Sequence, residues 1–209
     1  MVDFPPEERA AFEIFRLTPV VHSLDDLPAV SVPYQLKIDS GIYRRTEAWG
    51  NLVRTGHATY SYVSPARGGP PVAALRVKPA LTWKATVLSV KDIEAGAQVG
   101  YGGMHRAERP MRIAVLAAWY ADGIPHRLSN RGSVIAKGKF APIAGAVSMD
   151  LTTIDVSACP ELRVGDAVTL LGSEGDVSID AQQIARLAGT ISYSVLCGIS
   201  ARVKRVYVD

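Results

Sequence analysis

Cysteine and long hydrophobic runs are both scarce in this sequence. Its two cysteines, Cys159 and Cys197, lie 38 positions apart and belong to no CxxC pair or Cys/His cluster, which argues against a disulfide framework and a zinc site. The longest uninterrupted apolar run, residues 113–121, has nine residues, about half of what a helix needs to span a bilayer. The acidic N-terminal residues lack the basic and apolar regions of a secretory signal. We therefore expect a cytoplasmic protein with no membrane partner.

A strong excess of charge of one sign is also missing. The 23 basic and 20 acidic residues leave a net charge of +3, too little to imply a nucleic-acid partner. Basic residues concentrate only at 43–45 and 105–112, and neither stretch has a pattern typical of RNA or DNA binding. Walker, HExxH and GxSxG motifs are absent, and we predict no metal site. The 48% apolar and 21% charged residues, over a length of 209, are typical of a folded protein with one large domain or two modest ones.

The residues before position 73 carry mixed helical and strand patterns. Residues 5–17 begin with prolines and acids and then place apolar side chains at helical spacing, which predicts a helix of about three turns. Residues 18–24 and 34–39 predict two strands, with a short helical piece between them at 23–27. A helix, a strand, a crossover and a strand are typical of an α/β unit.

The residues after position 73 have the pattern of β-structure. Residues 74–90, 167–171 and 201–208 alternate apolar and polar side chains, with glycine and proline between the runs, which predicts a small barrel or a pair of packed sheets. The predicted fold class is therefore α+β, mainly β. It has a C-terminal β-barrel or sandwich domain at 73–209, preceded by an incomplete α/β portion at 1–72.

One late helix is predicted among these strands. Asp180 is placed to cap its N-terminus, with Gln183 three residues further on, and Gly189 is placed to end it. We expect Ile184 and Leu187 to lie on its inner face.

The second part of the chain resembles a known family. The resemblance is to the C-terminal β-domain of alanine racemases, and it is carried in order and spacing by the strings RIAVLAAWYADGIPHRLSNRG, APIAGAVSMDLTTIDVS, VGDAVTLLG and GTISYSVLCGISARVKRVYV. It runs without obvious gaps from about residue 72 to 209. Alanine racemases depend on pyridoxal 5'-phosphate (PLP), which an N-terminal (β/α)8 barrel holds, and their β-domain contributes to the partner subunit's active site. The resemblance implies the family's reaction, the interconversion of L- and D-alanine.

The first 72 residues resemble only pieces of that family's barrel. Two consecutive barrel strands are similar to TPVVHSLDDL and LKIDSG, and the last barrel strand with its exit loop is similar to NLVRTGHATYSYVSP. A closed (β/α)8 barrel takes about 250 residues. The family's VKANAYGHG-type segment, which carries the Schiff-base lysine, has no match in the sequence. The resemblance therefore implies a heavily truncated remnant of the barrel.

Racemisation needs two acid/base groups, one on each face of the substrate Cα. In the family these are the Schiff-base lysine and the tyrosine of a GYADG motif. The matching string here is WYADG, so the resemblance assigns the catalytic role to Tyr120. A phenol titrates near pH ~10 and needs a cationic neighbour to act as a base at neutral pH, for which His126 and Arg127 are candidates. From the residues alone, the favoured interpretation of Tyr120 is an ordinary tyrosine at a strand end before an Asp-Gly turn.

The resemblance assigns further site residues within the β-domain. Ser148, Met149 and Asp150 match a Cys-Met-Asp stretch that lines the partner's substrate pocket, and Tyr193 matches a tyrosine that reaches the cofactor phosphate. From the residues alone, Met149 could be a core residue and Tyr193 a buried tyrosine.

The resemblance also assigns residues in the barrel remnant. Arg54 matches the arginine that bonds the pyridine nitrogen of PLP, and Gly56 matches a glycine whose backbone N–H approaches the phosphate, although His57 replaces the usual isoleucine. Lys37 matches a lysine that is often carbamylated, and Arg44 matches the arginine that contacts it and the substrate carboxylate. The alternative is that these are surface charges.

Four hypotheses follow. None of the seven lysines lies in the family's lysine motif, so PLP is implied but its covalent attachment to this chain is not expected. In the first hypothesis the isolated chain is inactive and needs a partner, as a homo-oligomer or a heterodimer with a full-length racemase, to act on a small amino acid. Unpaired strand edges also favour association. In the others the chain is a non-catalytic dimerisation or binding module, a decayed gene product, or an enzyme with a new reaction.

Overall fold

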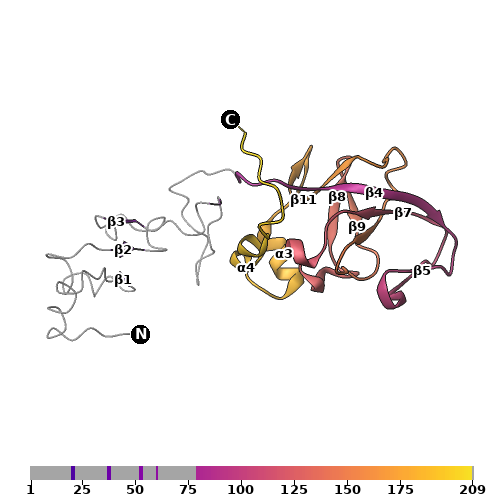
Figure 1. Cartoon of the computed structure of the whole chain (residues 1–209), viewed down its shortest axis with the longest axis horizontal. Coiled ribbons are helices and arrows are strands. Elements are labelled where there is room, and N and C mark those ends of the chain that lie inside the picture. The colour runs from indigo at the N-terminus through magenta and orange to yellow at the C-terminus, as the bar shows by residue number, and fades with distance from the viewer. Residues whose placement is uncertain (1–19, 22–36, 39–51, 54–59, 61–78, 209) are drawn as a thin grey trace. The chain divides into compact units, whose positions relative to one another are not determined.

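The computed structural model describes residues 20–21, 37–38, 52–53, 60 and 79–208. The chain divides into two compact units, residues 1–80 and 81–209, which are drawn together in Figure 1. Within the described residues, no helix has both the length and the apolar character that crossing a membrane requires.

The first unit contains a small parallel sheet. Its three strands are β1 (Val20–Val21), β2 (Lys37–Ile38) and β3 (Leu52–Val53). Strand β2 lies in the middle, and Lys37 pairs with Val20 on one side and with Leu52 on the other. The strands predicted from residues 18–24 and 34–39 are confirmed in these short segments. The helices predicted at 5–17 and 23–27 lie outside the described residues.

The second unit is built mainly from antiparallel strands. Its elements, with η marking a 3-10 helix, are in chain order β4 (Trp83–Ile93), β5 (Gln98–Val99), η6 (Tyr101–Gly103), β6 (His105–Arg106), β7 (Met111–Leu116), η7 (Tyr120–Asp122), η8 (His126–Leu128), β8 (Ser133–Ala136), β9 (Lys139–Pro142), β10 (Thr152–Asp155), β11 (Ala167–Glu174), β12 (Val177–Ile179), α3 (Ala181–Ala188) and α4 (Ser192–Gly198). This content confirms the predicted α+β, mainly β, fold class.

The main sheet closes into a barrel. Its strands follow the order β10-β7-β4-β11-β8-β9, each antiparallel to its neighbours, and β12 pairs with β11 as well. A bridge between Ile143 and Ile154, with a hydrogen bond of 2.9 Å from Ala144 N to Thr153 O, joins the two ends of this order. The bridge sets Ile143, the residue after β9, beside Ile154 of β10, so the two ends of the strand order meet.

The alternation seen in the sequence follows the two faces of the strands. In β4, Trp83, Ala85 and Val87 are buried, whereas the residues between them are exposed. Successive side chains of a strand point to opposite faces, so alternating apolar residues fill the barrel interior. A bulge between Val87 and Ser89 ends the strict alternation. The predicted run covers residues 74–90, but β4 begins only at Trp83, and residues 79–82 form no strand.

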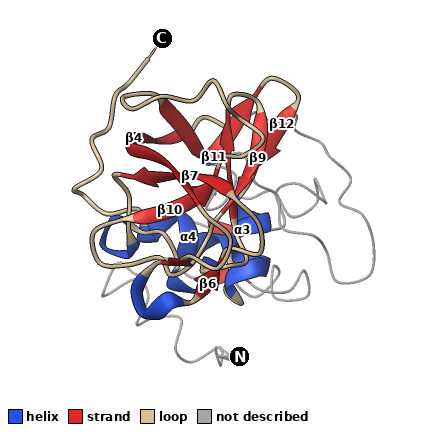
Figure 2. Cartoon of the chain, turned by 90° about the vertical axis from the view of Figure 1, so that its right-hand side faces the viewer, coloured by secondary structure: helices blue, strands red, loops and turns tan. Residues whose placement is uncertain are grey.

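Two helices lie together at one end of the strands (Figure 2). The predicted late helix is α3, and it has the full capping box: Gln183 N donates to Asp180 Oδ1 at 2.7 Å, and Asp180 N donates to Gln183 Oε1 at 2.8 Å. Gly189 ends it in a left-handed conformation. Ile184 is buried as predicted, but the prediction for Leu187 is wrong, because its side chain is about half exposed. Three residues advance a helix by about 300°, so Leu187 reaches only the edge of the buried face.

The prediction for the last strand is also wrong, and one helix was missed. Residues 201–208 form no strand, and their apolar side chains are largely exposed. An alternating pattern marks an apolar face, but a strand also needs a neighbour to accept its hydrogen bonds. Helix α4 escaped prediction because its serine, tyrosine, valine and cysteine are poor helix formers. Burial of Val195 and Leu196, in a helix that contacts α3, offsets that cost.

Candidate functional site

Tyr120 lies on a short turn just after β7. The chain leaves β7 at Leu116, is extended at Trp119 and then forms η7, which begins at Tyr120. Gly123 closes the turn in a left-handed conformation and donates its N–H to Tyr120 O at 3.0 Å. Glycine reaches positive φ without the steric cost that a Cβ brings, which explains the Asp-Gly pair. The turn leaves the Tyr120 side chain 41% exposed at the surface of the second unit.

Ser148 and the two residues after it form a second turn, which lies against the first. The hydroxyl of Ser148 accepts hydrogen bonds from Leu151 N at 3.1 Å and Asp150 N at 3.4 Å, and it donates to Leu151 O at 2.8 Å. Its hydroxyl is therefore engaged inside the turn. Met149 is 63% exposed and Asp150 is exposed, so the alternative of Met149 as a core residue is wrong.

Backbone contacts join these two turns. Tyr120 N donates to Ser148 O at 3.4 Å, and Thr152 Oγ1 donates to Ala118 O at 2.7 Å. Both contacts follow from strand register, because Leu116 at the end of β7 pairs with Thr152 at the start of β10. An antiparallel pair places the exit of one strand beside the entry of the other. Tyr120 and the 148–151 turn therefore lie at the same end of the barrel.

The end of α4 packs against the Tyr120 turn from another side. Ser200 N donates to Asp122 O at 2.9 Å, and a Cβ added to Gly123 would lie 2.8 Å from Gly198 C. Tyr193 precedes Gly198 by five residues on α4, which places the two about 7.5 Å apart along the helix axis. Its side chain is 42% exposed, so the alternative of a buried tyrosine is wrong.

Of the charged side chains near the Tyr120 turn, Arg202 contacts the turn and Arg127 does not extend towards it. Asp122 is a buried carboxylate, and its Oδ1 lies 3.8 Å from Arg202 Nε. Arg127, one of the two expected cationic neighbours, extends elsewhere: its Nη1 would lie 2.7 Å from a Cβ on Gly189, at the C-terminal end of α3. Carbonyl groups at a helix C-terminus favour a cation there. Sequence reasoning missed Asp122 and Arg202, although Asp122 belongs to the same WYADG string.

Some predicted site residues are not placed by the structure. Arg44, Arg54 and Gly56 lie outside the described residues. Lys37 lies in β2, and only its backbone is described. The described residues therefore bring together Tyr120 and the 148–150 stretch and connect them through α4 to Tyr193.

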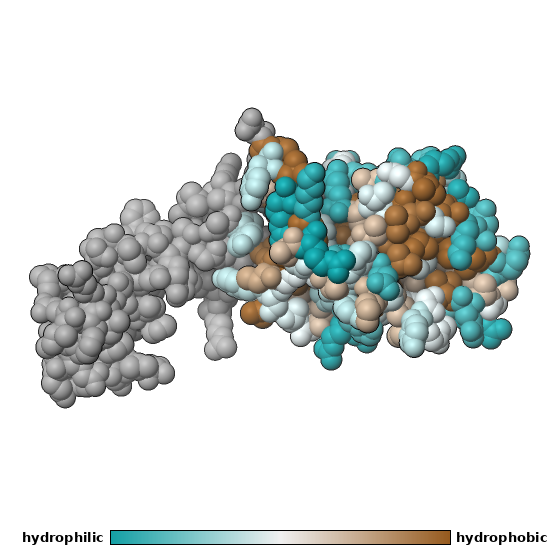
Figure 3. Space-filling model, viewed as in Figure 1, coloured by the Kyte–Doolittle hydropathy of each residue, from teal (hydrophilic) through white to brown (hydrophobic). Residues whose placement is uncertain are grey.

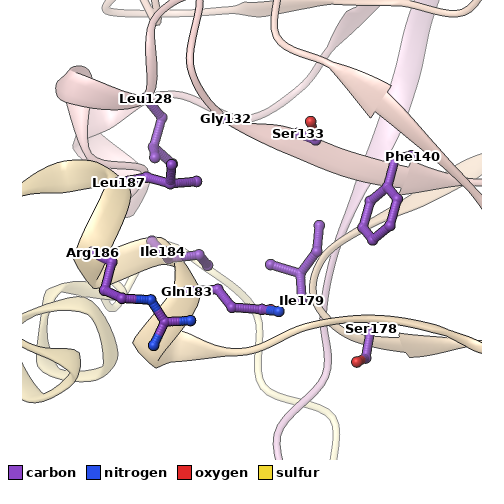
Figure 4. A pocket seen from close by; sticks show the side chains of 10 residues that line it. All are labelled: Leu128, Gly132, Ser133, Phe140, Ser178, Ile179, Gln183, Ile184, Arg186 and Leu187. Atoms are coloured by element: carbon purple, nitrogen blue, oxygen red, sulfur yellow. The ribbon is translucent and has the colours of Figure 1, made fainter.

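Two cavities in the second unit lie away from these residues. The larger, about 410 Å³, lies between α3, β12 and the β8–β9 hairpin (Figure 4). Its walls are mainly apolar and are formed by Leu128, Gly132, Ser133, Phe140, Ser178, Ile179, Gln183, Ile184, Arg186 and Leu187. A cavity of about 20 Å³ lies deeper, near Trp83 and Val195. Neither is lined by a predicted site residue.

The described residues do not by themselves fit PLP. Tyr193 is the only member of the predicted cofactor-binding set among them, and it lines neither cavity. A phosphate site normally combines several convergent donors or a helix N-terminus with its cofactor pocket. Within residues 79–208, no group of three His, Cys, Asp or Glu side chains is arranged to hold a metal ion.

Comparison with known proteins gives the chain a consistent set of relatives. The family model "Alanine racemase, C-terminal domain" matches residues 80–207. An alanine racemase of Methylacidiphilum infernorum is 36% identical over 84% of this chain and 44% of its own length. One of Clostridium perfringens is 37% identical over 92% of this chain and 49% of its own length. The chain thus spans less than half the length of these curated relatives.

Solved structures agree with these relatives. The alanine racemase of Bacillus anthracis with bound L-Ala-P has a TM-score of 0.79 and 32% identity, covering 89% of this chain and 49% of its own. The alanine racemase of Bartonella henselae with covalently bound pyridoxal phosphate has a TM-score of 0.77 and 25% identity, covering 97% of this chain and 60% of its own.

Proposed function

The chain belongs to the alanine racemase family, and we propose that it takes part in the interconversion of L- and D-alanine as the component that carries Tyr120. The observation that supports this role is the presentation of Tyr120. Its backbone is held by Ser148 and by the turn closed at Gly123, while its side chain is partly exposed. A fixed backbone with an accessible phenol suits a group that must meet a substrate.

The proton chemistry sets what Tyr120 does. Racemisation removes the Cα proton on one face and returns a proton on the other. The Tyr120 phenolic oxygen would hold or accept the proton on one face. The exposed Met149 and Asp150 would border the substrate on the same side. When bound, PLP supplies the electron withdrawal that makes the Cα proton removable. The group for the other face, and the cofactor, would come from elsewhere.

We place that second group on another polypeptide. None of the seven lysines of this chain lies in the family's lysine motif, and the described residues do not enclose PLP. The 209-residue chain alone is therefore inactive, and it acts in a complex with a full-length racemase that holds the cofactor. This proposal keeps PLP as a cofactor of the complex, without covalent attachment to this chain.

A complementation assay tests this function. The chain is mixed with the Clostridium perfringens alanine racemase in which the tyrosine matching Tyr120 is replaced by phenylalanine, and D-alanine formation is followed by chiral chromatography. We expect no activity from this chain alone, recovery on mixing with wild-type chain, and no recovery with Tyr120→Phe. Tyr101→Phe is the matched control, because Tyr101 is 86% exposed and lies outside the proposed site. Equal recovery with wild type and Tyr120→Phe would refute the role of Tyr120.

A non-catalytic binding module is the second candidate. Met149 and Ile191 are exposed apolar residues of the second unit, and Figure 3 shows a hydrophobic area on the face of this unit turned to the viewer. Exposed apolar patches often mark protein contacts. Size-exclusion chromatography of the mixture separates the two candidates, since a stable complex without recovered activity supports a binding module only.

A further inference from the structure

The segment after α4 runs along the Tyr120 turn. It contributes a backbone hydrogen bond, from Ser200 N to Asp122 O at 2.9 Å. Arg205 keeps the segment in place: its Nη2 donates to Ile199 O at 2.8 Å, and its Nη1 donates to Val203 O at 2.6 Å and to Ser200 O. The cation therefore binds carbonyl groups at the C-cap of α4 and in the segment just after it. The path of the chain up to Arg202 is fixed as a result.

Arg202 contacts residues on both sides of Tyr120. Its Cζ lies 5.0 Å from the centre of the Trp119 ring, and its Nε lies 3.8 Å from Asp122 Oδ1. Trp119 directly precedes Tyr120, and Asp122 follows it by two residues. A planar guanidinium can stack on an aromatic ring while its edge faces a carboxylate, which an ammonium cannot do in the same way. One side chain thus spans the whole turn.

We propose that Arg202 is a positioning residue for Tyr120: by stacking on Trp119 and pairing with Asp122, it holds the turn so that the phenol keeps one orientation. Arg202 itself does not touch the substrate. The catalytic consequence rests on the proposed function, whereas the effect on the turn stands without it.

Nitration of tyrosine tests the effect on the turn in the full chain. Tetranitromethane is applied to wild type and to Arg202→Gln, and the rate at each tyrosine is read by peptide mass spectrometry. The strength of an exposed cation–π contact corresponds to a factor of about two to five in an equilibrium constant. We therefore expect Tyr120 to be nitrated about two to five times faster in Arg202→Gln than in wild type. Tyr101 and Tyr207, which are exposed in both proteins, should be unchanged. In Arg202→Lys, the nitration rate of Tyr120 should lie between those of wild type and Arg202→Gln.

Two further variants make the result specific. The double variant Trp119→Phe/Arg202→Gln should increase the Tyr120 nitration rate by less than the two single variants together, because both substitutions act on one contact. Arg163→Gln is the control for loss of an arginine elsewhere: Arg163 donates to backbone carbonyls in a separate loop, so Tyr120 should react as in wild type. An unchanged Tyr120 rate in Arg202→Gln, or an equal increase at Tyr101 and Tyr207, would overturn the proposal.

The complementation assay separates this proposal from the proposed function. In active mixtures, Arg202→Gln should lower kcat about two- to fivefold and leave KM unchanged, which loss of substrate binding would not do. If the wild-type mixture is inactive but the nitration pattern holds, Arg202 positions the turn and the proposed function fails. If the mixture is active and Arg202→Gln leaves kcat unchanged, the positioning role is refuted.

Discussion

Replacing Gly123 with alanine tests the contact that joins the Tyr120 turn to α4. Gly123 has a φ of +113°, and a Cβ at this position would lie 2.8 Å from both Gly198 C and Ile199 Cα. Those neighbours are backbone atoms, so they cannot move aside as a flexible side chain would. The new methyl group would have to push the end of α4 away from the turn or force the turn to change its conformation.

The size of the effect follows from three contributions. A left-handed conformation costs a non-glycine residue about 1–2 kcal/mol. Forcing an extra methyl group into packed structure costs about 1–3 kcal/mol. Replacing glycine also reduces the entropy of the unfolded chain, which returns about 0.4–1 kcal/mol. We therefore expect Gly123→Ala to lose about 2–4 kcal/mol of unfolding free energy, a large fraction of the stability of a domain of this size.

Urea denaturation of the full chain, followed by circular dichroism, measures this loss. Gly165→Ala is the matched control: Gly165 has a φ of +89°, but a Cβ there would meet nothing within 4 Å. It should lose only the conformational part, about 1 kcal/mol or less. The difference between the two variants isolates the steric contact. Equal losses would refute the reasoning that the turn and the end of α4 are packed backbone against backbone.

Two further predictions concern Asp166 and Asp180. The backbone N–H of Arg163 and the ammonium of Lys137 hold the pKa of Asp166 below its ordinary value of 3.8. The Asp166 carboxylate therefore stabilises the fold above pH 3.8, and this contribution is lost as the pH falls through the lower pKa that Asp166 has in the folded protein. Asp166→Asn should therefore lower Tm at pH 7 and make little difference at about pH 2, whereas an equal decrease at both pH values would contradict this assignment. Asp180→Ala removes the side-chain acceptor of the α3 capping box and should cost about 1 kcal/mol by urea denaturation, while Asp180→Asn should cost clearly less. Equal losses in the two Asp180 variants would show that the capping bond does not stabilise α3.

Local patterns predicted the elements whose causes are local. The cap of α3 depends on residues three positions apart, and β4 depends on alternation within its own run, so both were visible in the sequence. Helix α4 was missed because contact with α3, and not its own composition, stabilises it. The strand expected at 201–208 failed for the converse reason, since its composition suits a strand but no neighbour among the described residues pairs with it.

The same distinction between local and distant causes applies to the site residues. The Asp-Gly pair predicted the turn that follows Tyr120, because turn chemistry is local. The contact between Tyr120 and Ser148 depends on the pairing of Leu116 with Thr152, and that pairing was not predictable from either segment alone. The resemblance to a known family supplied both residues together. It did not supply Arg202, because the contacts of that side chain with Trp119 and Asp122 join two segments that lie far apart in the sequence.

The geometry of the second unit bears on how the proposed chemistry is divided. Strand register and the α4 contact hold the Tyr120 turn and the 148–151 turn together within this unit. The expected cofactor contacts at Arg54 and Gly56 belong to the other part of the sequence. An acid/base group built by one unit and a cofactor held by another can be carried on separate polypeptides, provided that the two surfaces meet. That separation is the reason for our proposal that Tyr120 acts in a complex, and complementation is the assay that tests it.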